Sequence, residues 1–318
     1  ASGLVFLSAP ILYLFITDPF WLIPVRFFHG TATAILGPVI AAIIAERFPE
    51  KKGEMLGQYS SATLIGRTLA PLAGGAIISF FILDPGLIPY KMVYVAAAIA
   101  AVPVVFLTLT YREDSPGGLT ILPFSLFKRS FVTFFSHRRL RATALVDMAT
   151  YFAFGAVETF LPLILVSRGM DAYQTGILFA VQVVVIAVTK PLFGRIADRV
   201  DKRGQIVAGL LILGFSVAVI PFASSFGMLL SVSSLLGIGM SLSTVATSAY
   251  VADMAREEEM GASMGALSSV MDIGHAAGPL VTGVIITIGG FVQGFFASFL
   301  IAAVVCIVFV FSVREQKT

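Results

Sequence analysis

Apolar residues gather in long runs along the chain, separated by short polar connections. A hydrocarbon core about 30 Å thick needs roughly 20 apolar residues per helix, and the runs read in those units predict ten helices. They are expected at 1–17, 20–45, 56–82, 91–110, 143–166, 173–194, 205–222, 226–251, 261–288 and 291–312. The run 226–252 shows no two-residue alternation, which favours helices over the strands of a membrane barrel. The pattern therefore predicts an all-α membrane protein.

Composition agrees with a lipid environment. Hydrophobic residues make up 58% of the 318 residues and charged residues 12%, whereas soluble domains carry about 25% charge. A net charge of +3 is too slight to suggest nucleic acid, and the single cysteine, Cys306, excludes a disulfide framework and a cysteine-based metal site. We expect the lipid bilayer, a small-molecule substrate and protons as partners of a monomer, with no nucleic acid, cofactor or metal.

The basic residues predict an orientation. If the connection after the second helix is cytoplasmic, the loops and tail on that side hold sixteen Lys and Arg residues, and the opposite loops hold only Lys91 and Arg168. This asymmetry is the positive-inside pattern. We therefore expect an integral protein of the plasma (inner) membrane, with the basic segment 111–142 and the C-terminus in the cytoplasm.

The chain contains an internal repeat. Residues 53–78 align with 261–286 at an offset of 208, with eleven of 26 positions identical, including matched glycines and the pair Pro71 and Pro279. Apolar helices can resemble one another by chance, so the inference of a repeat depends on the Gly and Pro residues that match at the same spacing. They predict two homologous halves, an N-terminal bundle at 1–110 and a C-terminal bundle at 143–318, joined by a linker at 111–142.

The two halves contain unequal numbers of expected helices. The second half has six and the first has four, and the third segment of the first half aligns with the fifth of the second. The chain also begins inside an apolar run without Met. We therefore expect a parent protein of twelve helices, of which the first two are absent here.

Three motifs carry a family resemblance. Residues 194–203, GRIADRVDKR, resemble the cytoplasmic-loop signature G-x-x-x-D-R-x-x-R/K-R of the major facilitator superfamily, and 26–30 resemble the R-x-x-x-G of its fourth helix. Residues 66–75 are similar to the G-x-x-x-G-P-x-x-G-G of its fifth helix, which is associated with antiporters, although Ala70 replaces one glycine. The resemblance covers the whole chain. It implies a drug/proton-antiporter-like transporter of two six-helix bundles related by pseudo-symmetry, here ten transmembrane helices with a truncated N-terminal bundle.

The motifs also have a physical interpretation. Proline removes a helical hydrogen bond and bends its helix, and glycines let neighbouring backbones approach closely. The expected bend and packing residues are Gly66, Pro71, Gly74, Gly75, Gly274, Gly278, Pro279 and Gly283, at the seam on which the halves would rock. The expected cytoplasmic gate residues are Gly194, Asp198, Arg199, Lys202 and Arg203, where Asp198 pairs with a basic residue, caps a neighbouring helix or only anchors the loop.

Ionisable residues inside the expected helices mark a candidate polar pathway, because charges at membrane depth are costly. The candidate proton-coupling and cavity residues are Arg26, Arg67, Glu158, Asp272 and His275. Glu158 is expected to be a lone buried carboxylate that carries the proton, or else to form a static salt bridge with Arg26 or Arg67. Asp147 and Lys190 are expected within about one turn of the cytoplasmic face, where they snorkel or pair with loops.

These expectations define a secondary transporter that exports a small amphipathic solute by alternating access in exchange for protons. A metabolite uniporter or proton symporter would use the same scaffold, and a non-transporting membrane receptor remains an alternative from another class. An enzyme is not expected, because the sequence has no HExxH motif, no paired catalytic aspartates and no Ser/His pair at diagnostic spacing.

Overall fold

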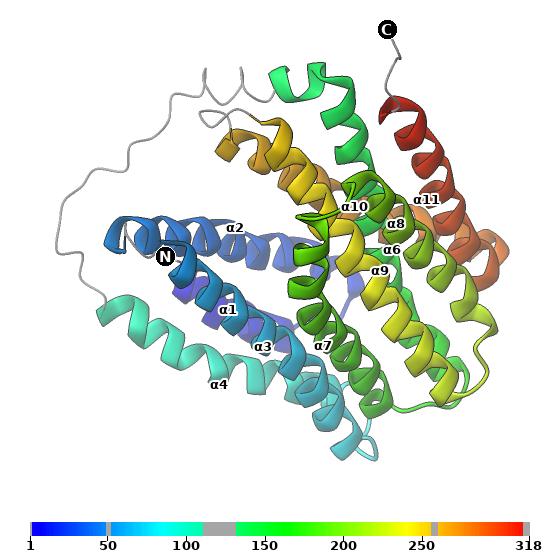
Figure 1. Cartoon of the computed structure of the whole chain (residues 1–318). Helices are drawn as coiled ribbons and strands as arrows, with labels where there is room; N and C mark the ends of the chain where they lie inside the picture. The colour runs from blue at the N-terminus through cyan, green and yellow to red at the C-terminus, as the bar shows by residue number, and fades with distance from the viewer. Residues whose placement is uncertain (1, 49–51, 111–131, 256–259, 314–318) are drawn as a thin grey trace, which may run out of the picture. The chain divides into compact units, whose positions relative to one another are not determined.

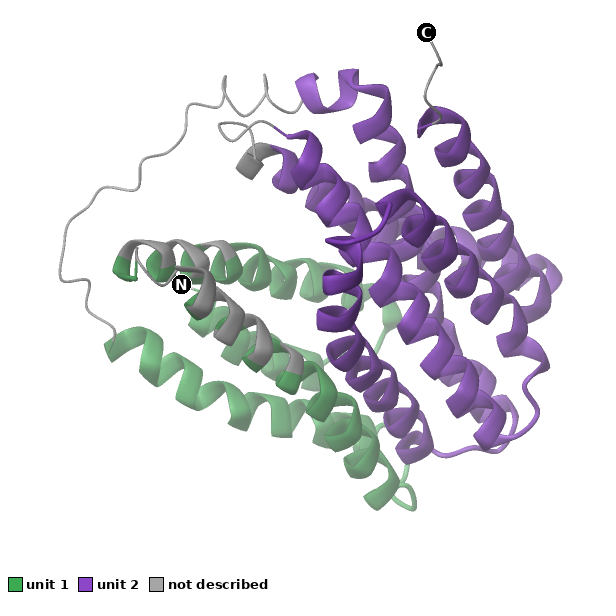
Figure 2. Cartoon of the chain, viewed as in Figure 1, with its two compact units in different colours: residues 1–119 green, residues 120–318 purple. Residues whose placement is uncertain are grey.

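The computed structural model describes residues 2–48, 52–110, 132–255 and 260–313, and its contacts divide the chain into two units, Ala1–Leu119 and Thr120–Thr318 (Figure 2). The described residues of unit 1 form four α-helices and one short 3-10 helix (Figure 1). Their bounds are α1 Ser2–Leu14, η1 Pro19–Trp21, α2 Leu22–Arg47, α3 Lys52–Phe80 and α4 Ile88–Thr110.

Among its described residues, unit 2 contains six long α-helices (Figure 1). Their bounds are α6 Arg138–Ser167, α7 Ala172–Ala197, α8 Lys202–Val219, η3 Ile220–Phe222, α9 Phe226–Met254, α10 Met260–Gly289 and α11 Phe291–Val313. Each of the ten expected apolar segments thus coincides with a helix, which confirms the all-α prediction.

Seven helices among the described residues combine the length and hydropathy needed to cross a membrane. They are α4, α6, α7, α8 together with η3, α9, α10 and α11, while α1 and the Ile65–Phe80 part of α3 are apolar but shorter. Ten spans and a truncated bundle therefore stay predictions.

The helices of unit 2 begin and end at residues suited to those positions. Asp171 forms a capping box with Gln174 at the start of α7, and the side chains of Asp201 and Ser225 accept backbone N–H bonds at the starts of α8 and α9. Just after α6 the chain turns at Gly169, which has a positive φ of 73°. Local sequence therefore determines where α7, α8 and α9 begin and where α6 ends.

Glycines bring the helices of unit 2 into very close contact. A Cβ on Gly274 or Gly278 of α10 would collide with the carbonyl oxygen of Met148 or Phe152 of α6. A Cβ on Gly239 of α9 would lie 2.6 Å from the backbone nitrogen of Leu213 of α8. Only glycine permits such backbone contacts, and in lipid they take the place of the hydrophobic driving force between helices.

Aromatic contacts connect three helices in the described part of unit 1. The Tyr13 ring of α1 stacks on Tyr94 of α4 with centroids 4.6 Å apart, and the edges of Tyr13 and Phe6 meet the ring of His29 of α2 at 6.1 and 5.8 Å. Such ring pairs contribute about 0.5–1.5 kcal/mol beyond their burial. They tie α1 to both α2 and α4.

The expected linker 111–142 ends differently from the prediction. Residues 111–131 lie outside the described residues, but 132–136 are helical and α6 begins at Arg138, inside the expected linker. Phe134 is 1% exposed and packs in a cluster with Leu140 and Val251. The hydropathy pattern missed the first turn of α6, because the Arg residues in that turn lower the local mean hydropathy although the segment is helical.

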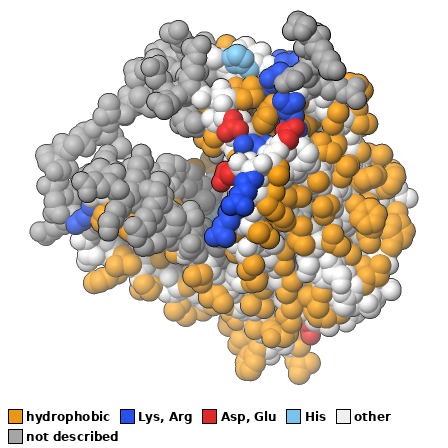
Figure 3. Space-filling view, viewed as in Figure 1, with side chains coloured by type: hydrophobic (Ala, Val, Ile, Leu, Met, Phe, Trp, Pro, Cys, Tyr) orange, Lys and Arg blue, Asp and Glu red, His pale blue; other side chains and the backbone are white. Residues whose placement is uncertain are grey.

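Large hydrophobic side chains cover much of the surface. On α4, for example, Ile99, Phe106 and Leu109 are each about two-thirds exposed (66%, 66% and 69%). Figure 3 shows hydrophobic side chains over most of the described surface of unit 2 on the side in view, with most of the charged side chains gathered in one band. A surface this apolar marks a membrane or protein interaction face, and with seven spanning helices it indicates a membrane protein.

Candidate functional site

Two of the predicted residues, Glu158 of α6 and His275 of α10, form a direct pair. The Nε2 atom of His275 lies 2.7 Å from Oε2 of Glu158, a hydrogen bond in which the carboxylate accepts. Both side chains are nearly half exposed, at 43% for Glu158 and 46% for His275. The pair is therefore formed within unit 2 and stays accessible to a proton or a solute.

Aromatic rings and a glycine hold this pair in place. The His275 ring stacks on Phe154, with centroids 6.1 Å apart, and meets the edge of Tyr151 at 6.4 Å. A Cβ on Gly155 would lie 2.6 Å from the His275 carbonyl oxygen and 3.1 Å from its ring. Because Gly155 lets α10 approach α6 so closely, the imidazole reaches a carboxylate one turn further along α6.

The expectation that Glu158 is a lone buried carboxylate is therefore wrong. Its partner within unit 2 is His275, and a salt bridge with Arg26 or Arg67 of unit 1 stays a prediction. Sequence spacing links residues on one helix, such as Asp272 and His275, but it does not identify which side chains meet across a helix interface. Asp272 is exposed on α10, and Arg26 on α2 and Arg67 on α3 are also exposed.

Asp147 was placed wrongly by sequence reasoning. It lies in the third turn of α6 because that helix begins at Arg138, and it is only 4% exposed. The Thr247 hydroxyl of α9 donates a 2.6 Å hydrogen bond to its Oδ1, and Lys190 of α7 lines the same pocket. A buried and hydrogen-bonded carboxyl does not snorkel, so Asp147 is a polar element of the interior of unit 2.

We predict that Thr247→Val lowers the stability of the protein by about 1–3 kcal/mol, because it leaves the buried Asp147 oxygen without its donor. The control is Thr150→Val, which breaks the 3.1 Å bond between Thr150 and Ser243, two neutral and fully buried side chains on the same pair of helices. Thermal unfolding in detergent should show the larger loss for Thr247→Val. An equal loss for both variants would mean that the carboxyl does not depend on this donor.

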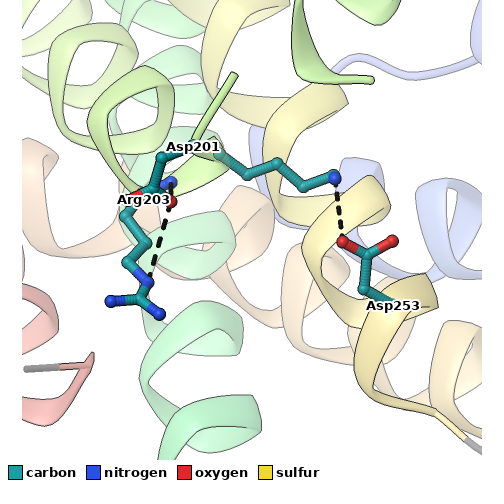
Figure 4. A network of polar contacts seen from close by, with 4 residues as sticks. Asp201, Arg203 and Asp253 are labelled. Carbon is teal, nitrogen blue, oxygen red and sulfur yellow. Dashed lines mark hydrogen bonds and ion pairs between the residues drawn. The ribbon is translucent and has the colours of Figure 1, made fainter. Parts of the chain in front are cut away.

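The predicted gate motif, residues 194–203, lies at the connection between α7 and α8, and Figure 4 shows Asp201 and Arg203 from its last part. Gly194 and Asp198 end α7, and Asp198 and Arg199 are exposed, while the side chain that caps α8 belongs to Asp201, whose Oδ1 accepts from the Arg203 backbone. Asp198 therefore does not cap the helix that follows it. The Arg203 guanidinium lies 3.7 Å from the same Asp201 oxygen.

Lys202 connects this motif to a second helix. Its Nζ lies 2.8 Å from Oδ2 of Asp253, near the end of α9 (Figure 4). Lys202 is the first residue of α8 and Asp253 is next to last in α9, so each charge sits at the helix end where the helix dipole disfavours it. The pairing offsets that cost, which makes the two helix ends dependent on one another.

We predict that Asp253→Asn frees the end of α9 from α8. The pair is partly exposed and contributes no more than about 1 kcal/mol. A cysteine introduced at Ala255, after removal of Cys306, should therefore react with a water-soluble maleimide about two to five times faster than in the parent protein. The double reversal Lys202→Asp with Asp253→Lys should restore the parent rate; faster labelling in that variant would show that the ion pair does not hold the end.

The glycine and proline motifs have different surroundings in the two units. In unit 2, Gly274 and Gly278 contact the α6 backbone, and a Cβ on Gly283 would lie 3.0 Å from the Phe160 ring. In unit 1, a Cβ on Gly66 would meet nothing within 4 Å, and one on Gly74 would lie 3.9 Å from Val93. Gly75 is buried, and Pro71 and Pro279 each lie within a continuous helix.

Long apolar helices that carry a few polar pairs indicate a membrane protein. The sequence profile of the Major Facilitator Superfamily matches residues 1–181 and, separately, 143–318. The chain therefore belongs to the major facilitator superfamily of transporters, as the motifs predicted.

Relatives and solved structures agree with this assignment. An uncharacterized MFS-type transporter of Methanocaldococcus jannaschii is 21% identical over 94% of this chain and 76% of its own length. The multidrug resistance protein MdtG of Yersinia enterocolitica is 28% identical over 56% of this chain and 44% of its length, and the human synaptic vesicular amine transporter is 34% identical over 34% and 22%. These two alignments thus cover less than half of either relative.

The fold has a close counterpart among solved structures. The crystal structure of a bacterial homolog of the human lysosomal transporter Spinster, in an inward-facing and occupied conformation, matches with a TM-score of 0.80 at 16% identity. The match covers 100% of this chain and 84% of that one. At this identity the likeness establishes the fold alone.

Proposed function

We propose that the chain belongs to an exporter that moves a small amphipathic solute by alternating access in exchange for protons. The observation that carries this proposal is the 2.7 Å pair of Glu158 and His275, a carboxylate and an imidazole on two closely packed helices of unit 2. Carboxyl and imidazole groups both exchange protons, and the short contact lets a proton pass between them. Together they form a group able to take up and release one proton.

In the proposed cycle, a proton and the solute compete for the Glu158 carboxylate. A proton on Glu158 weakens its attraction to His275, because the carboxylate loses its charge. A polar or cationic group of the solute binds the ionised carboxylate and so displaces the proton. Arg26, Arg67 and Asp272, which are exposed on their helices, are proposed to tune the charge of the solute pathway.

The close packing of α6 and α10 supports a further part of the proposal. Gly274 and Gly278 leave no space between the two backbones, so a change at the pair is passed directly from one helix to the other. We propose that Pro71, Pro279 and their flanking glycines form the seam for rocking of the halves. We propose that Asp198, Arg199 and the other gate residues close the pathway on the cytoplasmic side, and the contact between Lys202 and Asp253 holds α8 and α9 together at that end of unit 2.

The names of the relatives agree with this substrate class. Several are multidrug resistance proteins of bacteria, among them MdtG of Proteus mirabilis, which is 25% identical over 52% of this chain and 42% of its length. Export of an amphipathic solute is therefore the activity we propose, in the plasma (inner) membrane and with the C-terminus in the cytoplasm.

The proposal is tested in proteoliposomes with an acidic interior. Ethidium, leucine and salicylate serve as cationic, zwitterionic and anionic probes, and each is added outside with and without the pH gradient. We expect at least one probe to accumulate only with the gradient. Equilibration of a probe without any effect of the gradient would indicate a uniporter, accumulation only with the reversed gradient would indicate a symporter, and either result would contradict the proposal.

A further inference from the structure

Unit 2 contains a second polar site in addition to the Glu158 and His275 pair. A pocket of about 310 Å³ lies among α6, α7, α9 and α10 and is lined by Asp147 and Lys190. Hydroxyl groups from Thr244, Ser248 and Ser268 line the same pocket. This volume is at the small end of the range for ligand pockets, about 300–1,000 Å³.

The negative group of this pocket, Asp147, is buried and held in place by a hydrogen bond. Asp147 is 4% exposed, and the Thr247 hydroxyl fixes one of its oxygens at 2.6 Å. Thr247 is itself fully buried. The carboxyl is therefore oriented by the protein, and Asp147 lines the pocket. Holding a carboxyl at this depth is costly unless a partner of opposite charge or hydrogen-bond donors compensate it.

The positive side comes from a different helix. Lys190 lies about two turns before the end of α7, and its charge acts on the Asp147 carboxyl. The pocket therefore carries one group of each charge and has no net charge when both are ionised. A solute with only a cationic group would meet repulsion from Lys190, and one with only an anionic group would meet repulsion from Asp147.

The rest of the wall is apolar. Met264, Leu267 and Met271 of α10 line the pocket beside the two charged residues. Methionine side chains adapt to ligands of irregular shape. The pocket thus combines two opposite charges, hydroxyl groups and an adaptable apolar wall.

We propose that this pocket binds a small zwitterionic solute, with its ammonium group on Asp147, its anionic group on Lys190 and its apolar body against Met264, Leu267 and Met271. The inference rests on the proposed transport function, since it names the class of solute, and it adds a binding site distinct from the proton-coupling pair. A zwitterion places an opposite charge beside each of the two residues, whereas a cation is repelled by Lys190 and an anion by Asp147.

The test is a binding measurement with three probes of one carbon skeleton. They are leucine, which is zwitterionic, 3-methylbutylamine, which lacks the carboxylate, and 4-methylpentanoate, which lacks the ammonium group. Each is titrated into the purified full chain in detergent at pH 7, and the dissociation constant is obtained from the rise of the unfolding temperature. We expect leucine to bind at least about tenfold more tightly than either analogue, because the amine is repelled by Lys190 and the carboxylate by Asp147, and neither carries the opposite charge that offsets this repulsion.

Two variants should change which of the three probes binds most tightly. Lys190→Met leaves a single negative charge, so 3-methylbutylamine should become the tightest probe. Asp147→Asn leaves a single positive charge, so 4-methylpentanoate should become the tightest. Met271→Trp keeps both charges but fills the pocket, and it should weaken leucine binding at least tenfold. If Asp147→Asn does not fold, Lys190→Met and Met271→Trp still decide the question.

Several outcomes would overturn the inference. These are equal affinities for the three probes, no effect of any probe on the unfolding temperature of the parent protein, or an unchanged preference in Lys190→Met. An effect of these variants on stability alone would assign Asp147 and Lys190 a structural role. The assay needs no membrane and no pH gradient, and Asp171→Asn, which changes an exposed carboxylate at the start of α7, should leave the preference for leucine intact. Failure of proton coupling is therefore distinguishable from failure of this site.

Discussion

Glu158→Gln is expected to abolish accumulation of solute against its gradient. Glutamine keeps the size of glutamate and can still hydrogen-bond to His275 across the 2.7 Å contact, but it cannot bind a proton at neutral pH. The variant should fold and should let solute equilibrate across the membrane. The driving force from the pH gradient should be lost.

The size of this effect follows from the free energy of the gradient. One pH unit supplies about 1.4 kcal/mol per proton, which is tenfold in concentration for a one-for-one exchange of a neutral solute. With an imposed gradient of one unit, accumulation should fall from up to about tenfold in the parent protein to none in Glu158→Gln. The measurement is uptake into proteoliposomes of the probe that the parent protein accumulates.

A matched control is available on α7. Asp171 is an exposed carboxylate whose side chain caps that helix, and asparagine caps helices about as well as aspartate. Asp171→Asn therefore removes one carboxylate at no cost to the fold and should keep gradient-driven accumulation. If Glu158→Gln accumulates solute as well as Asp171→Asn does, Glu158 is not the proton-coupling carboxylate.

Gly274→Ala is expected to destabilise the protein and to disrupt the α6–α10 contact. The added methyl group would collide with the carbonyl oxygen of Met148, a backbone atom that cannot move unless the whole of α6 shifts. Overpacking of this kind costs about 1–3 kcal/mol or more. The loss outweighs the gain of about 0.5–1 kcal/mol that alanine brings to a helix interior.

The internal repeat supplies the control for this variant. Gly66 occupies the position in α3 that aligns with Gly274, but a Cβ there would meet nothing within 4 Å. Gly66→Ala should therefore be neutral or slightly stabilising. Unfolding temperatures measured in the same detergent should rank Gly66→Ala at or above the parent protein and Gly274→Ala several degrees below it. The reverse order would show that the close packing of α6 and α10 is not required.

Much of the fold was predictable because membrane helices leave a strong signal. Runs of apolar residues gave ten segments, and each coincides with a helix. Errors arose where charge and helix overlap: the three arginines Arg138, Arg139 and Arg141 resemble a loop in hydropathy but begin α6. The helix start was therefore missed by about one turn, and the depth of Asp147 was underestimated with it.

The candidate site was predictable only in part, for a related reason. The sequence marked Glu158 and His275 as membrane charges but did not reveal that they form a pair, because the register between two helices depends on packing. Gly155, which faces the His275 carbonyl, was the signal that sequence reasoning did not use. Asp253, the partner of Lys202, was not predicted, because the contact between the start of α8 and the end of α9 depends on how the two helices pack.

The central claim is that solute and proton exchange through the Glu158 and His275 pair, and the most direct test is to follow the protons. Proteoliposomes with an acidic interior are loaded with pyranine, a pH-sensitive dye, and the probe that the parent protein accumulates is added outside. The account predicts that the interior becomes alkaline only when the probe is present, and that this signal disappears in Glu158→Gln. Entry of the probe into parent proteoliposomes without any proton movement, or the same proton signal in Glu158→Gln, would contradict it.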